Sequence, residues 1–368
     1  MRLRSTSLLV ILLLVAVLAV VVAGCGGNGE ETTTTTTASG GEETTTTGAP
    51  PAETITWVWN ISATGTATSP YGLTAQYFAD EIEKRSDGRL VVELNYGGAL
   101  GYKAAEMLET VSERLVDGGD LSLPHIVGSE PLGNFGSLPF LHQGYDEYWD
   151  WLDNLLVPKL APEFEEKWGV VPIGTFTFGS MYLLWNEALD EVEQVNGQRF
   201  RIFGDINAEF WKSLGVNVIY LPVEELQTAM ERNMIDGMPN SNALIDQLEA
   251  WEYYEYRNDL GAIIGSSMFI VNKEAFDALP DDLQQLVMEV GADMTEAGRG
   301  FLQEDDARMT EELPGKGMET HIVPKETLEQ MRDTGKKAWM DWATTTSPLA
   351  EEIMKETFAM LGMEWSAE

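Results

Sequence analysis

Cysteine, histidine and basic residues are all scarce in this chain of 368 residues. It has one cysteine, which excludes an internal disulfide, so a hydrophobic core must hold the fold. Its 23 Lys and Arg stand against 60 Asp and Glu and leave a net charge of −37. Because binding of nucleic acid depends on clustered Lys and Arg that neutralise phosphates, this balance excludes a nucleic-acid-binding protein.

Enzyme motifs are missing as well. The sequence has no Gly-x-Ser-x-Gly elbow, no phosphate-binding Gly-x4-Gly-Lys-Ser/Thr loop and no His-Glu-x-x-His zinc helix. His125, His142 and His321 stand far apart, which predicts ordinary loop or interface residues and not a metal or proton-transfer site. We therefore expect no catalytic residue, no metal and no cofactor, and these absences disfavour the alternative of a tethered hydrolase.

A long apolar run occurs at the N-terminus, over residues 8–23, after Arg2 and Arg4. A basic start and an apolar run too short to span a membrane are typical of a secretory signal peptide. The run ends in Val-Ala-Gly-Cys, which resembles a bacterial lipobox. This predicts a signal peptide over residues 1–24 and an extracytoplasmic protein anchored to the membrane by a lipid on Cys25; the alternative is an uncleaved anchor helix.

The next segment, residues 25–54, consists almost wholly of Gly, Thr, Glu, Ala and Pro and includes two runs of Thr. It has too few apolar side chains to offset the conformational entropy lost on folding. We expect a flexible tether that holds the folded part away from a lipid surface.

Strand and helix patterns then alternate along the chain, which predicts an α/β protein with largely parallel pairing. After the tether, over three hundred residues are enough for two lobes of ordinary domain size. From Pro280 onward the pattern is mainly helical. The expected strands cover residues 55–59, 90–96, 170–176, 200–203, 216–221 and 267–271, and the expected helices include 73–82, 104–115, 224–234 and 242–251.

One segment, residues 196–242, resembles the DctP-type binding proteins of tripartite ATP-independent periplasmic (TRAP) transporters. Asn-Gly-Gln-Arg-Phe-Arg-Ile at residues 196–202 is similar to the Gly-Leu-Lys-Ile-Arg-Val strand of that family. Leu-Gly-Val-Asn-Val at 214–218 and Asn-Met-Ile-Asp-Gly at 233–237 resemble its Leu-Gly-Ala-x-Pro and Gly-Val-Val-Asp-Gly motifs. Further similar motifs lie at residues 88–93, 97–101, 138–141 and 272–284, so the resemblance covers nearly the whole mature chain.

The resemblance implies a receptor of two α/β lobes, joined by crossing strands and a long helix, that closes on a solute by a hinge motion. We expect lobe I to comprise residues 55–178 and 266–305, and lobe II residues 179–265 and 306–368. The implied partners are a small organic carboxylate and the membrane subunits of a TRAP-type transporter, and the receptor is expected to be a monomer. A surface sensor that reports a solute to a signalling protein is the alternative with the same fold.

The family pattern also implies a ligand site. Its carboxylate-binding arginine corresponds to Arg201, and a planar guanidinium offers two parallel donors to a carboxylate. The local sequence alone favours a surface arginine at a strand edge, and the resemblance reverses that preference. Asn240 matches a family position that often donates to the same carboxylate, although an Asn before a helix at residues 241–242 could also be a helix cap.

Two departures from the pattern bear on specificity. Met181 stands where many members have a second arginine, which indicates that one cation is lost, and Pro239 replaces a common Glu. With apolar groups near the expected cleft, this predicts a monocarboxylate with an apolar or aromatic body. The candidate contacts, each of which could instead pack in a core, are Trp59, Tyr71, Phe178, Met181 and Phe203.

Overall fold

The computed structural model describes residues 54–61, 66–263 and 265–366. The predicted signal peptide, Cys25 and the predicted tether up to residue 53 lie outside these residues. Among the helices that the structure does describe, none combines the length and the apolar character that crossing a membrane requires.

The first sheet has the order β2-β1-β3-β10-β4. In β1, alternation buries Trp57 and Trp59, which are 2% and 0% exposed, against the helices on one face. Helix α1 follows, with Ser69 as its N-cap and Pro70 in its first turn. The strands are β1 (Ile55–Asn60), β2 (Leu90–Asn95), β3 (Gly118–Ser122), β4 (Val170–Thr177) and β10 (Ser266–Asn272).

The second sheet has the order β11-β9-β5-β8, and a two-stranded sheet of β6 and β7 continues it. The connection is a parallel bridge between Phe200 and Gly237, supported by the bond from the Arg201 backbone N–H to the Gly237 carbonyl. The strands are β5 (Ser180–Trp185), β6 (Arg199–Arg201), β7 (Asn217–Ile219), β8 (Met238–Asn240), β9 (Tyr256–Ile263) and β11 (Glu319–Ile322).

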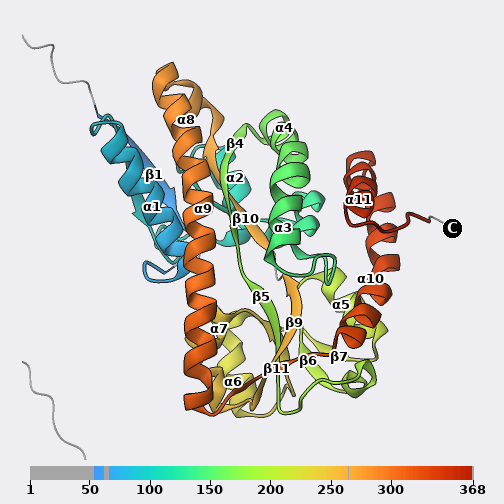
Figure 1. Ribbon diagram of the computed structural model, residues 1–368. Coiled ribbons are helices and arrows are strands. Elements are labelled where there is room, and N and C mark those ends of the chain that lie inside the picture. The colour runs from blue at the N-terminus through green and yellow to red at the C-terminus, as the bar shows by residue number, and fades with distance from the viewer. Residues whose placement is uncertain (1–53, 62–65, 264, 367–368) are drawn as a thin grey trace, which may run out of the picture. The chain divides into compact units, whose positions relative to one another are not determined.

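The expected parallel pairing is wrong for half of this architecture. Strand β10 runs antiparallel to both β3 and β4, and β5 runs antiparallel to both β8 and β9. The reason is that the chain passes from the first sheet to the second through β4 and β5, and returns through β9 and β10 in the opposite direction (Figure 1).

The two passages form one antiparallel ribbon that runs through both sheets. At the crossing, the Phe178 backbone N–H donates to the Gly265 carbonyl at 2.8 Å. Gly179 and Gly265 have φ values of 109° and 136°, which other residues rarely adopt. The crossing therefore combines a backbone hydrogen bond between the two passages with two backbone positions that depend on glycine.

Helix α9 (Asp281–Glu312) runs alongside both sheets (Figure 1). Its first half packs closely against α1 and β4, and its second half contacts α7. The other helices are α1 (Pro70–Arg85), α2 (Met107–Ser112), α3 (Tyr145–Trp151), α4 (Val157–Trp168), α5 (Asp205–Ser213), α6 (Leu226–Glu231), α7 (Asn242–Gln247), α8 (Lys273–Asp277), α10 (Lys325–Thr346) and α11 (Pro348–Met360).

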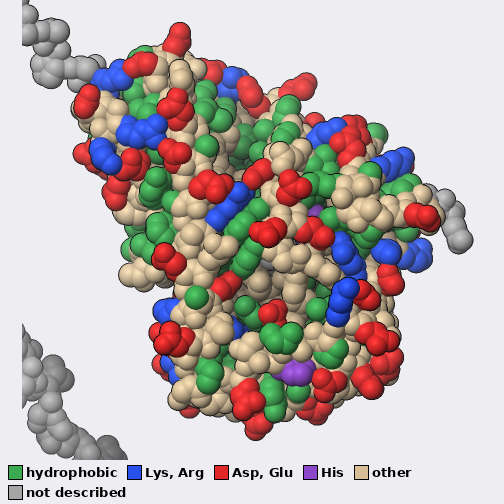
Figure 2. Space-filling model, in the orientation of Figure 1, with side chains coloured by type: hydrophobic (Ala, Val, Ile, Leu, Met, Phe, Trp, Pro, Cys, Tyr) green, Lys and Arg blue, Asp and Glu red, His purple; other side chains and the backbone are tan. Residues whose placement is uncertain are grey.

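The C-terminal helix α11 packs beside α3 and α4. The Trp151 indole N–H donates to Thr357 Oγ1 at 2.8 Å, and Lys159 pairs with Glu352 and Glu356. The predicted division places residues 151–159 in lobe I and α11 in lobe II. These contacts therefore join segments of the two predicted lobes, and the division itself stays a prediction. On the face shown in Figure 2, Asp and Glu are spread widely and Lys and Arg lie among them.

Gly291 lets α9 approach β4 closely. A Cβ at Gly291 would lie 1.9 Å from the Ile173 carbonyl oxygen of β4, whereas one at Gly300 on the same helix would have no atom within 4 Å. We expect Gly291→Ala to lower the free energy of unfolding by about 2 kcal/mol through overpacking, and Gly300→Ala to raise it by about 0.5 kcal/mol through helix propensity. Urea unfolding followed by tryptophan fluorescence measures both, and equal effects would contradict the close approach.

Candidate functional site

The candidate site lies where several strands of the second sheet end. Arg201 is the last residue of β6 and Asn240 the last of β8, and these strands run parallel. Strand β5 runs antiparallel to β8 with Tyr182 opposite Asn240, so it begins at the same edge. In α/β folds, ligands bind beyond the carboxyl ends of parallel strands, and the structure brings Arg201 and Asn240 together at such an edge.

Arg201 is a buried cation without a described counter-charge. It is 5% exposed, and among the described residues no carboxylate lies within ion-pair distance of it. Its Nε donates to the Leu221 carbonyl at 3.1 Å, and its guanidinium carbon lies 5.3 Å from the centre of the Phe203 ring. Burial lowers the pKa of Arg201 to about 10, so the group stays charged at neutral pH. A buried guanidinium of this kind is suited to an anionic group brought in from solution.

Asn240 is also buried, at 5% exposed. Its Oδ1 accepts from the backbone N–H of Ser241 at 3.0 Å, and its Nδ2 approaches Met238 Sδ at 4.0 Å. Helix α7 begins at Asn242 with Ser241 as N-cap and without a side-chain capping bond, so Asn240 does not cap it. The amide N–H donors of Asn240 are therefore only weakly used by the protein.

Tyr71 and Phe178, two of the predicted contacts, touch each other. Their ring centres lie 5.6 Å apart in an edge-on arrangement, and Tyr71 also stacks on Phe176 at 4.7 Å. The Tyr71 hydroxyl donates to Asp120 at 2.5 Å and lies 2.9 Å from Ser267 Oγ. Phe178 is half-buried at the crossing of the two sheets, whereas Tyr71 is held in a polar and aromatic cluster at the start of α1.

Trp59 and Met181 are placed in cores. Trp59 is fully buried, stacks on Phe78 at 4.8 Å and lies parallel to Phe269 at 6.2 Å. Met181, near the start of β5, is 2% exposed and belongs to a hydrophobic cluster. Trp59 therefore packs in the core, the alternative that its sequence context left open. Met181 is also buried, but it precedes Tyr182, which lies opposite Asn240 at the edge of the candidate site.

Sequence reasoning missed His125 as a site residue. It follows β3 in a short 3-10 helix, and its Nδ1 lies 2.7 Å from Ser122 Oγ. The side chain is exposed, yet enclosure by the protein lowers its pKa; the charge of Asp120 raises that pKa and the charge of Arg201 lowers it. His125 therefore lies within electrostatic reach of Asp120 and Arg201. Its place after the end of a strand parallel to β1 is the signal that could have found it.

A depression of about 570 Å³ lies elsewhere, between the end of α5 and α10. Its walls carry Glu193, Asn196 and Asp333 and no cationic side chain. It does not suit a carboxylate, and the buried Arg201 remains the better anion site.

Comparisons with known proteins agree with this geometry. Residues 61–345 match the model of the bacterial extracellular solute-binding proteins of family 7, DctP. A solute-binding protein of Verminephrobacter eiseniae is 25% identical over 262 residues, which are 70% of this chain and 77% of the relative. One of Albidiferax ferrireducens is 25% identical over 278 residues, or 74% of this chain and 82% of the relative.

Solved structures show the same fold. DctP7 of Bordetella pertussis, an extracytoplasmic solute receptor binding pyroglutamic acid, has a TM-score of 0.73 at 22% identity over 82% of this chain and 99% of its own. A TRAP periplasmic solute-binding protein of Rhodoferax ferrireducens with bound malonate has a TM-score of 0.73 at 21% identity over 83% and 98%. These likenesses confirm the predicted two-lobed periplasmic-binding-protein fold.

The buried charge of Arg201 has a measurable cost in stability. Because its pKa is lowered in the folded state, the charged form is penalised in full at every pH below about 10, and the penalty falls only as pH rises from that value toward the ordinary 12.5. At neutral pH we expect Arg201→Met to raise the free energy of unfolding by about 1 kcal/mol, after the loss of its hydrogen bond is deducted.

Arg199 on the same strand is the matched control. It is exposed and pairs with Asp236 at 2.5 Å, so Arg199→Met should lower the free energy of unfolding only slightly. Urea unfolding of the two variants measures the contrast. A large loss of stability in Arg201→Met would show that the protein already satisfies this cation.

Proposed function

Because this chain belongs to family 7 of the bacterial extracellular solute-binding proteins, the DctP family that its motifs predict, we propose that it captures a small organic carboxylate on Arg201 and delivers it to the membrane subunits of a TRAP-type transporter. The observation that carries this proposal is the burial of Arg201 without a carboxylate partner among the described residues. A receptor of this family binds its solute and does not transform it.

A carboxylate on Arg201 would receive two parallel N–H donors from the guanidinium and a third from the Asn240 amide. These donors come from neighbouring parallel strands, so their separation is fixed by the sheet. Phe203 lies against the guanidinium, and Phe178 stands at the crossing. Together they favour a solute with one carboxylate and a compact apolar or cyclic body.

Pyroglutamic acid, named for three of the solved relatives, fits this description of the solute. Malonate, bound by another, carries a second carboxylate. In this chain Met181 stands where many family members have a second arginine, so the second carboxylate of a dianion would lack that cation. We therefore place monocarboxylates before dicarboxylates as solutes.

Capture would proceed by closure of the two lobes about the crossing. Gly179 and Gly265 give the backbone freedom to rotate in both passages of the chain. Small changes in their torsion angles would move each lobe, with its strand ends, as a rigid body. The solute can drive closure only through contacts that it makes in the closed form. Lipidation of Cys25 after removal of residues 1–24 would keep the receptor at the membrane, on the extracytoplasmic side.

The role of Arg201 in capture is tested by thermal shift with pyroglutamate, malonate and related carboxylates. A solute that binds only the native state raises the melting temperature by mass action. We expect a shift of several degrees in the wild type and in Arg199→Ala, and none in Arg201→Ala. A shift that survives in Arg201→Ala would overturn the assigned role.

His125 gives capture a pH dependence. Its pKa lies below the usual value near 6.5, so the ring is neutral at pH 7 and gains charge only as pH falls further. A second positive charge near Arg201 would attract the carboxylate, so affinity for pyroglutamate should rise as pH falls below the usual histidine range. Isothermal titration of the wild type and His125→Gln tests this expectation, because the rise should vanish in the variant.

A further inference from the structure

A polar network lies under the strand ends of the candidate site and links them to α9. Asp306 of α9 accepts a hydrogen bond from Asn242 Nδ2 at 2.5 Å and another from the Tyr145 hydroxyl. Asn242 is the first residue of α7, two positions after Asn240, and Tyr145 is the first residue of α3. One carboxylate thus binds segments that are far apart in the sequence.

The Tyr145 branch reaches the start of β5. The Tyr145 oxygen accepts from the backbone N–H of Ser180 at 3.0 Å, immediately before Met181. A Cβ at the preceding Gly179 would lie 3.5 Å from that oxygen, so the hydroxyl packs directly against the crossing. Through this branch, Asp306 holds the point where the chain enters the second sheet.

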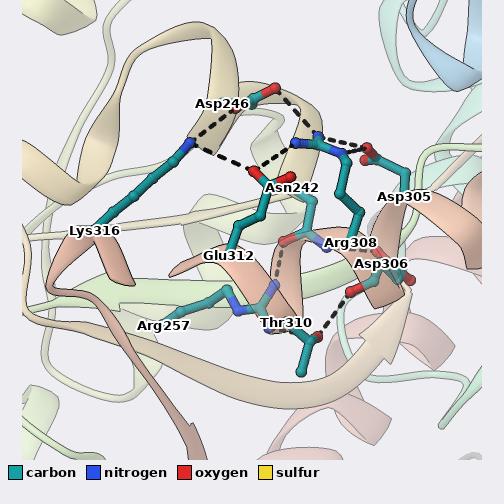
Figure 3. A network of polar contacts seen from close by, with 9 residues as sticks. All are labelled: Asn242, Asp246, Arg257, Asp305, Asp306, Arg308, Thr310, Glu312 and Lys316. Atoms are coloured by element: carbon teal, nitrogen blue, oxygen red, sulfur yellow. Dashed lines mark hydrogen bonds and ion pairs between the residues drawn. The ribbon is translucent and has the colours of Figure 1, made fainter. Parts of the chain in front are cut away.

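The Asn242 branch reaches Arg257, a second buried arginine, 1% exposed (Figure 3). Its Nη1 donates to Asn242 Oδ1 at 2.6 Å, so the Asn242 amide is placed between a cation and a carboxylate. The other donors of Arg257 bind the hydroxyls of Thr310 and Thr320, and its guanidinium lies 4.3 Å from the centre of the Tyr182 ring. Tyr182 is the residue that pairs with Asn240 across β5 and β8.

The bonds of Asn242 fix its orientation, because its oxygen must face the arginine and its nitrogen the carboxylate. Burial raises the pKa of Asp306, while its hydrogen bonds from Tyr145 and Asn242 lower it. Figure 3 also shows the neighbouring Asp305 turned toward Arg308, with which it pairs at 2.7 Å in a separate group of charged side chains. Two adjacent aspartates on α9 therefore have different surroundings.

We propose that Asp306 is a positioning residue for solute capture, holding the end of β8 that carries Asn240 through Asn242, and the start of β5 through Tyr145. The inference rests on the proposed function for its effect on binding, whereas the positioning itself can be measured without a solute. The side-chain hydrogen bonds described for Asp306 go to Tyr145 and Asn242, neither of which is a predicted ligand contact, so Asp306 acts through these two residues.

Hydrogen exchange followed by mass spectrometry tests the positioning in the unliganded protein. Asp306→Asn keeps the size of the side chain but replaces one acceptor oxygen by an N–H donor that faces another donor. The variant loses or weakens a buried hydrogen bond to a charged group in each branch. We therefore expect backbone amide exchange to become about tenfold faster in residues 178–182 and 240–243. Tyr145→Phe should accelerate only residues 178–182.

Asp305→Asn is the matched control, since it makes the same charge change one residue away and should leave both segments unchanged. Titration with pyroglutamate supplies the second arm, where we expect about tenfold weaker binding in Asp306→Asn and wild-type binding in Asp305→Asn. Unchanged exchange in Asp306→Asn, or the same acceleration in Asp305→Asn, would overturn the proposal. Faster exchange in Asp306→Asn with unaltered affinity for pyroglutamate would overturn it as well. If the wild type binds none of the carboxylates, the proposed function fails, and the exchange arm still decides the positioning.

Discussion

The antiparallel ribbon formed by β4 and β5 with β9 and β10 is the constraint on which the other parts of the structure depend. It fixes the direction of every strand beside it, and so it makes both sheets mixed. It also brings the start of β5 to the edge where β6 and β8 end, which is the edge that carries Arg201 and Asn240. A site built in this way can be rigid within each sheet and still change at the crossing, where the ladder passes through Gly179 and Gly265.

Sequence reasoning located the strands whose patterns are local. The aromatic alternation at residues 55–59 and the β-branched run at 170–176 correspond to β1 and β4. It did not find β9, because Arg257 and Asn258 interrupt the apolar pattern of that strand. Both are buried, and their polar atoms bind residues 15 to 75 positions away, such as Asn242 and Leu183. A strand whose polar residues are satisfied over such separations carries no periodic signal of its own.

The candidate site, like the strands, could be predicted only in part from the sequence. The family motifs predicted Arg201 and Asn240 as ligand contacts, and the structure places both at the ends of neighbouring parallel strands. Composition and strand-end position could not separate Trp59, which packs against Phe78, from His125, which is exposed near Arg201. The difference depends on which neighbours cover each side chain, and that is a property of tertiary packing. The network around Asp306 was invisible for the same reason, since its members come from six separate elements.

A net charge of −37 does not conflict with capture of an anion. Exposed carboxylates act on an approaching solute through water and salt, where their potential decays over a Debye length of about 8 Å. A guanidinium that is 5% exposed acts at short range in a medium of lower dielectric, where each direct contact is stronger. One such cation can neutralise one carboxylate. A second carboxylate would have to be solvated or paired elsewhere, and Met181, at the position where the resemblance predicts a second arginine in many family members, is apolar. The charge balance of the site, more than its volume, therefore argues for a solute with a single negative charge.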